Sequence, residues 1–242
     1  MAFNKNLLAV ASLSALSLVA PNSVLAQGSG WTGSGEAGFN KTTGNTDTQT
    51  ISARLKMGYG FEKSDYTATI EVENKKESGN SISDRYLLEQ QYDYFLNANR
   101  DFYTFANLRN ERNKPTDLKL DNTISVGLGR LLYKTDASLL KGEIGIGYQD
   151  VDLYNGDDFD QTTGRLKLDF AHKFNETYSF GQDALYVTGS EQDKIETNTR
   201  LRAALNSKLS ASLGYKYRYN SNPGSGLKKT DGETNISLIY NF

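Results

Sequence analysis

Acidic and basic residues recur at every second position in several segments of this chain, a spacing that places side chains on one face of a β-strand. The acidic set comprises Glu71, Glu73, Glu89, Asp93 and Glu111, and the basic set comprises Arg165, Lys167, Arg200, Arg202, Lys216 and Arg218. Apolar residues occupy the intervening positions, so both sets would point into the lumen of a barrel whose apolar face contacts lipid. We expect acids and bases to lie on opposite arcs of the wall. Such arcs could orient charged or dipolar solutes in a water-filled pore, or pair across a tight lumen and plug it.

The single histidine, His172, is the other residue whose type suggests chemistry. A barrel lipid hydrolase would need a serine bonded to this histidine on the outer wall and a third residue to orient the ring. The chain has no Gly-x-Ser-x-Gly motif. The histidine shares a strand face with Leu168, Phe170 and Phe174, a pattern that favours an interfacial aromatic belt. We therefore predict no catalytic residues and no enzyme, and keep a barrel-type lipid hydrolase as the alternative function.

Metal, cofactor and nucleic-acid sites find little support in the sequence. Asp157, Asp158 and Asp160 crowd one connection and could bind Ca²⁺, but their spacing is not that of an EF-hand loop. The chain contains no cysteine, which excludes disulfides and thiolate metal sites. The formal net charge of −2 gives no general attraction to nucleic acid. We predict no metal, no cofactor and no nucleic-acid partner.

The elements that must position the charged residues are β-strands, because hydrophobicity alternates with a period of two along nearly all of the chain after Trp31. Between Ile51 and Phe61 every odd-numbered residue is apolar and every even-numbered residue is polar or glycine. A helix would scatter these residues around its circumference. The pattern predicts an all-β fold, a twelve-stranded antiparallel up-and-down transmembrane barrel, with strands at residues 31–42, 49–62, 66–77, 84–96, 101–113, 119–133, 138–154, 161–174, 177–189, 194–206, 209–220 and 231–242.

The connections between these strands alternate in length. Short turns are expected at 62–65, 97–100, 134–137, 175–176 and 207–208, and longer loops at 43–48, 78–83, 114–118, 155–160, 190–193 and 221–230. Outer-membrane barrels have short periplasmic turns and longer extracellular loops. The alternation therefore predicts which rim faces the periplasm.

The N-terminus resembles a secretion signal. Lys5 is the only charged residue among the first 26, an apolar stretch covers 7–20, and Val24-Leu25-Ala26 places small residues before a cleavage site. The apolar stretch is shorter than the ~20 residues needed to span a membrane. We predict a cleaved signal peptide at 1–26, with residues 27–242 forming one barrel in the bacterial outer membrane.

The C-terminus carries an expected assembly signal. Ile236, Leu238, Tyr240 and Phe242 alternate with more polar residues up to the chain end. This pattern is typical of the last strand that the barrel-assembly machinery recognises. The predicted partners are this machinery together with outer-membrane lipid and lipopolysaccharide.

The segment from Gly33 to Phe39, followed by Thr43-Gly-Asn45-Thr46-Asp-Thr48, resembles the YdiY-like family of salt-induced outer-membrane proteins, a domain of unknown function. In that family a Gly-rich first strand leads into a Gly-Asn-Thr turn, and the chain closes on an aromatic residue. The resemblance extends over essentially the whole chain that would remain after cleavage, and its distinctive parts are residues 33–48 and the C-terminus. It implies an outer-membrane barrel and carries over no catalytic residue. We therefore expect a porin-like narrow passive pore or a structural component of the envelope.

Overall fold

The computed structural model describes residues 30–42, 48–77, 80–224 and 226–242; at 40–42, 48, 77 and 80–83 only the backbone is described. The predicted signal peptide and its cleavage site lie outside these ranges. Within them, no helix is long and apolar enough to cross a membrane.

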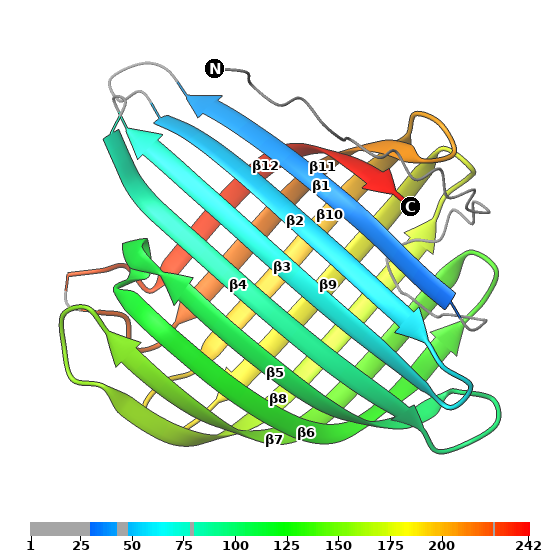
Figure 1. Ribbon diagram of the computed structural model, residues 1–242, viewed down its shortest axis with the longest axis horizontal. Helices are drawn as coiled ribbons and strands as arrows, with labels where there is room; N and C mark the ends of the chain where they lie inside the picture. Colours follow the sequence, from blue (N-terminus) through cyan, green and yellow to red (C-terminus); the bar gives the residue numbers. More distant parts are fainter. Residues whose placement is uncertain (1–29, 43–47, 78–79, 225) are drawn as a thin grey trace, which may run out of the picture.

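Twelve antiparallel strands form one closed sheet in the described part of the chain, with each strand beside its sequence neighbours and β12 beside β1. Figure 1 shows the strands running obliquely around this sheet. The strands are β1 (Gly30–Thr42), β2 (Thr48–Gly60), β3 (Ser64–Glu77), β4 (Asn80–Phe95), β5 (Phe102–Asn113), β6 (Leu118–Lys134), β7 (Ser138–Leu153), β8 (Phe159–Lys173), β9 (Tyr178–Thr188), β10 (Lys194–Ala204), β11 (Leu209–Asn220) and β12 (Thr230–Asn241). The predicted all-β barrel is confirmed.

Strand β4 begins four residues earlier than expected. Its first residues pair with the end of β3, and the register shifts between Lys75 and Lys76. The predicted loop at 78–83 is therefore wrong, because most of it continues the ladder. A bulge lets a ladder continue past an irregular residue, and the period-two pattern of the sequence does not reveal it.

Two ends of the barrel can be distinguished. The turn end carries the connections 61–63, 96–101, 135–137, 174–177 and 205–208 and the C-terminus. The loop end carries the remaining connections, among them a short 3₁₀ turn at Lys114–Thr116 that follows β5.

The apolar face of the sheet points outward. Ile144 and Ile236 are 65% and 66% exposed, whereas their chain neighbours Glu143 and Ser237 are each 4% exposed. This is the reverse of a soluble barrel, whose interior is apolar, and it is what a lipid environment requires. A slip of one residue in any ladder would exchange the two faces, so the alternation in sequence fixes the register.

An aromatic cluster narrows the lumen near the turn end. Phe95, Tyr103 and Phe105 are buried against one another inside the wall. Glycines make the room: a Cβ on Gly129 would lie 2.2 Å from the Tyr103 ring, and one on Gly127 would lie 2.8 Å from Phe105. The lumen beside β5, β6 and β7 is therefore filled by side chains.

Candidate functional site

The described residues enclose two larger chambers in the lumen, one toward each end. The loop-side chamber has a volume of about 730 Å³ and the turn-side chamber about 210 Å³. Arg85 and Glu196 line both chambers. These two residues therefore mark the level at which the chambers meet.

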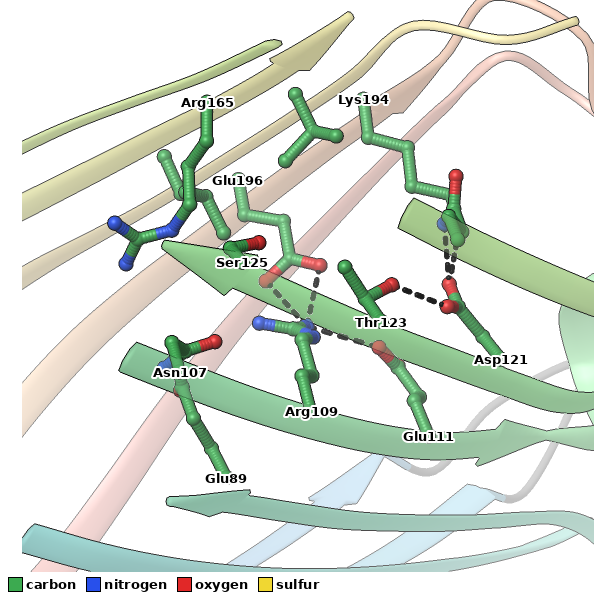
Figure 2. A pocket seen from close by; sticks show the side chains of 13 residues that line it. Glu89, Asn107, Arg109, Glu111, Asp121, Thr123, Ser125, Arg165, Lys194 and Glu196 are labelled. Carbon is green, nitrogen blue, oxygen red and sulfur yellow. Dashed lines mark hydrogen bonds and ion pairs between the residues drawn. The ribbon is translucent and has the colours of Figure 1, made fainter. Parts of the chain in front are cut away.

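A layer of ion pairs crosses the lumen at this level. Arg109 Nη2 on β5 lies 2.7 Å from Glu196 Oε1 on β10, and Lys216 Nζ on β11 lies 3.2 Å from Glu71 Oε2 on β3. Each of these pairs joins strands on opposite sides of the barrel, which several other strands separate in both directions around the sheet. Figure 2 shows Arg109 and Glu196 meeting among the residues that line a small pocket of about 30 Å³. We call the Arg109–Glu196 and Lys216–Glu71 pairs the cross-lumen layer.

A third ion pair spans the lumen on the loop side of this layer. Lys194 Nζ on β10 lies 2.6 Å from Asp121 Oδ2 on β6. Asp121 also accepts hydrogen bonds from Thr123 and Gln149. Lys194 lines the loop-side chamber but not the turn-side chamber, so this pair borders the junction without forming it.

The residues of the cross-lumen layer have more ion-pair partners on one wall of the barrel than on the facing wall. On the wall formed by β2 to β5, Glu71 is also paired with Arg54 and Arg85, each at 2.8 Å. On the same wall Arg109 is also paired with Glu111, at 2.9 Å. On the facing wall, Glu196 and Lys216 each have one ion-pair partner among the described residues. Parting the layer would therefore leave only Glu196 and Lys216 without a partner.

The β7–β8 side of the lumen is closed by buried polar groups. Arg165 is paired with Glu143 at 2.7 Å and stacks 4.7 Å from the centre of the Phe105 ring. Glu143 also accepts hydrogen bonds from Tyr103 and Gln91. Packing and hydrogen bonds hold these residues in place, whereas the residues that border both chambers are Arg85 and Glu196.

Every residue of the acidic and basic sets borders a space inside the barrel. Glu73, Glu111 and Arg218 line the loop-side chamber. Glu71, Glu89, Asp93, Lys167, Arg200 and Lys216 line the turn-side chamber. Arg165 lines the small pocket in the layer, and Arg202 lines a pocket near the turn end.

The expected separation of charge into two opposite arcs is wrong. Bases are interleaved with the acids Glu71, Glu73, Glu89, Asp93 and Glu111, and acids with the bases Arg165, Lys167, Arg200, Arg202, Lys216 and Arg218. Arg85 lies between Glu71 and Glu111 and is paired with both, while Arg200 is paired with Asp183 at 2.5 Å. An unpaired single-sign arc in a narrow lumen would cost free energy that local pairing avoids.

Sequence reasoning missed Arg109 and Glu196, which make the shortest contact of the layer. Arg109 lies two residues before Glu111, and Glu196 lies four residues before Arg200, so both share the parity of residues already selected. Their odd or even position along the strand would have been enough to predict that both side chains face the lumen. Their pairing across the barrel requires the three-dimensional register.

The structure brings a serine to the lone histidine. Ser138 Oγ lies 2.7 Å from His172 Nδ1, and the two residues are cross-strand partners on β7 and β8. The imidazole also meets Phe174 edge-on, with ring centres 4.9 Å apart. Within the described ranges, no hydrogen bond joins His172 to a third residue of the kind that orients the histidine in a Ser-His-Asp triad.

The acidic loop behaves as a structural turn. Asp158 accepts the backbone N–H of Leu153 at 2.9 Å, and Asp117 accepts the backbone N–H of Asn155. Across the described ranges, no cluster of three or more acidic or histidine residues is placed to hold a metal ion.

The C-terminal residues point outward, as lipid-facing side chains should. Ile236, Leu238, Tyr240 and Phe242 are each about half exposed or more, at 66%, 52%, 47% and 53%. The backbone of Phe242 makes two hydrogen bonds of 3.0 Å with Gly33 of β1, one as donor and one as acceptor. The last residue thus helps to close the barrel.

Solved structures with a similar fold include outer-membrane barrels. The NanC porin has a TM-score of 0.58 at 12% identity, covering 86% of this chain and 100% of that chain. An outer membrane channel from Pseudomonas putida F1 has a TM-score of 0.57 at 10% identity, covering 93% and 100%. The translocator domain of the autotransporter NalP from Neisseria meningitidis has a TM-score of 0.50 at 10% identity, covering 90% and 91%. At these identities the likeness concerns the fold alone.

No curated protein sequence matches the chain. A family model described as "Protein of unknown function, DUF481" matches residues 35–242, which span the barrel from β1 to the C-terminus. The resemblance to the YdiY-like proteins is consistent with this match. The chain therefore belongs to the DUF481 family of proteins of unknown function.

Proposed function

We propose that this protein is an exported barrel of the bacterial outer membrane that forms a narrow passive pore for small polar solutes. The observation that carries the proposal is the pair of chambers, about 730 Å³ and 210 Å³, that meet at a thin layer of ion pairs. Charged and polar side chains line both chambers, as expected of a water-filled path. A barrel with a purely structural role would need no such space.

A structural role remains the alternative reading of the same lumen, because the cross-lumen layer bridges the path. Two features favour a pore. The layer consists of two long, flexible side-chain pairs rather than a folded plug, and on the β2–β5 wall Glu71 and Arg109 keep other partners when the layer parts. We expect brief openings of small conductance.

The outer membrane is the location that the surface supports. The exposed face is apolar on all sides of the sheet, and solved structures that share this fold include a porin and an outer membrane channel. The N-terminal sequence supports export through a cleaved signal peptide at 1–26, and the C-terminal strand supports recognition by the barrel-assembly machinery. Outer-membrane lipid and lipopolysaccharide are the partners that such a surface would contact.

Current through the refolded barrel in a planar lipid bilayer tests the pore. We expect discrete, small conductance steps in KCl. A barrel that inserts, shows the heat-modifiable gel mobility of a folded barrel, and yet passes no current would overturn the pore and leave the structural role.

A lipid hydrolase is the second candidate, and the 2.7 Å contact between Ser138 and His172 is the observation that favours it. It is the weaker candidate, because no third residue is bonded to His172 among the described residues. Incubation of the barrel with phospholipid vesicles decides the matter: we expect no release of fatty acid. Release that is lost in Ser138→Ala would establish the hydrolase instead.

A further inference from the structure

Arg218 of β11 borders the loop-side chamber, and the described residues satisfy only part of its guanidinium group. Its Nε and Nη2 atoms are buried and have no hydrogen-bond partner among the described residues. Among the described residues its ion pair is a 4.0 Å approach of Nη1 to Glu233. The Nε and Nη2 atoms form one edge of the planar guanidinium group, the edge that binds a carboxylate through two parallel hydrogen bonds. A buried donor without a partner is costly, so this edge points to a ligand with a carboxylate or similar group.

Glu196 is the acidic residue on the neighbouring strand at the level of Arg218. It is the cross-strand partner of Arg218 in the β10–β11 ladder, and both residues line the loop-side chamber. Side chains at such positions start from Cβ atoms about 4.5–5.5 Å apart. Glu196 faces across the lumen to Arg109, its only ion-pair partner in the described part of the chain.

We propose that Arg218 and Glu196 form a binding site for small zwitterionic solutes that carry an ammonium group close to a carboxylate. The proposal rests on the proposed pore function and deepens it by naming the solute class. The solute carboxylate binds Nε and Nη2 of Arg218, and its ammonium group binds the Glu196 carboxylate. Opposite charges on neighbouring side chains match opposite charges a few ångströms apart on the solute.

Binding at this site also parts the Arg109–Glu196 pair of the cross-lumen layer. The ammonium group replaces Arg109 as the partner of Glu196, and Arg109 keeps its 2.9 Å contact with Glu111. No charge is left alone at this pair, so the exchange avoids the cost of an uncompensated buried ion. A solute with a carboxylate but no ammonium group binds Arg218 and leaves the Arg109–Glu196 pair intact. A neutral solute forms neither ion pair.

Glycine and glycolamide test the proposal, because they are isomers of equal size and only glycine is a zwitterion at neutral pH. Their rates of uptake are measured as swelling of liposomes that contain the refolded barrel, with the rates of protein-free liposomes subtracted. We expect glycine to enter about tenfold faster than glycolamide, the scale of one charge-assisted hydrogen bond. In Arg218→Gln and in Glu196→Gln the ratio should fall toward one.

Lys229→Gln and Glu191→Gln are the matched controls, since each removes the same charge from an exposed residue of the loop-side chamber. Both should keep the preference for glycine. Equal entry of glycine and glycolamide into the unmodified barrel overturns the zwitterion site and leaves the pore intact, and this comparison needs no variant to fold. A preference that survives in both site variants also overturns it. Entry of neither solute overturns the pore and the site together.

Discussion

The Arg109–Glu196 pair predicts that loss of Arg109 lowers the free energy of unfolding more than loss of Glu196 does. Arg109→Gln leaves Glu196, whose side chain is 20% exposed, with no ion-pair partner in the described part of the chain. Removing one partner of a fully buried pair costs about 3–5 kcal/mol. The partial exposure of Glu196 and the chambers on either side reduce this to about 2 kcal/mol.

The reciprocal change should cost less. Glu196→Gln leaves Arg109 paired with Glu111 at 2.9 Å, and the new amide oxygen can still accept a hydrogen bond. We expect a loss of about 1 kcal/mol. The double variant should lose about 2 kcal/mol rather than the sum of about 3, because its two changes remove the same contact.

Urea unfolding of the barrel from lipid vesicles measures these differences. Trp31 is the only tryptophan, and it is 71% exposed on the outer face, so its fluorescence reports the loss of lipid contact. The control variant is Lys229→Gln, which changes charge outside the cross-lumen layer. Equal losses for the two single variants, or a double variant that loses their full sum, would refute the reasoning.

Two further predictions concern packing and closure. A methyl group at Gly129 would lie 2.2 Å from the Tyr103 ring, so Gly129→Ala should lower the free energy of urea unfolding by about 1–3 kcal/mol; Gly35→Ala, which meets no atom within 4 Å, is the control, and equal effects would contradict the packing described. Deletion of Phe242 removes two 3.0 Å backbone hydrogen bonds to Gly33. It should lower the yield of heat-modifiable barrel in the outer membrane, and an unchanged yield would argue against its role in closure.

The fold could be predicted from the sequence because one physical cause dominates it. Lipid outside and a polar lumen inside force apolar and polar residues to alternate, so every strand is visible as a period of two. The prediction failed at the start of β4, where the backbone ladder continues through residues that do not alternate. Hydrogen bonding of the backbone, rather than side-chain pattern, extends the strand there.

The site could be predicted only in part. Parity placed residues such as Lys216 and Arg218 beside the lumen, because facing in or out is a local property of a strand. It gave no information on which charges meet across the barrel. The contact between Arg109 and Glu196 joins residues 87 positions apart. Whether Arg218 finds hydrogen-bond partners among the described residues depends on every side chain packed around it. Such features follow from the closed register and not from any single segment.

The central claim is that the cross-lumen layer is the constriction of a pore, and single-channel current tests it most directly. The unmodified barrel and the Arg109→Gln/Glu196→Gln double variant are compared in planar bilayers at equal KCl concentration, after both show the gel mobility of a folded barrel. We predict small, brief openings for the unmodified barrel and larger or longer ones for the double variant, because one of the two ion pairs of the cross-lumen layer is gone. Identical currents would place the constriction elsewhere, and two folded barrels that pass no current would contradict the account.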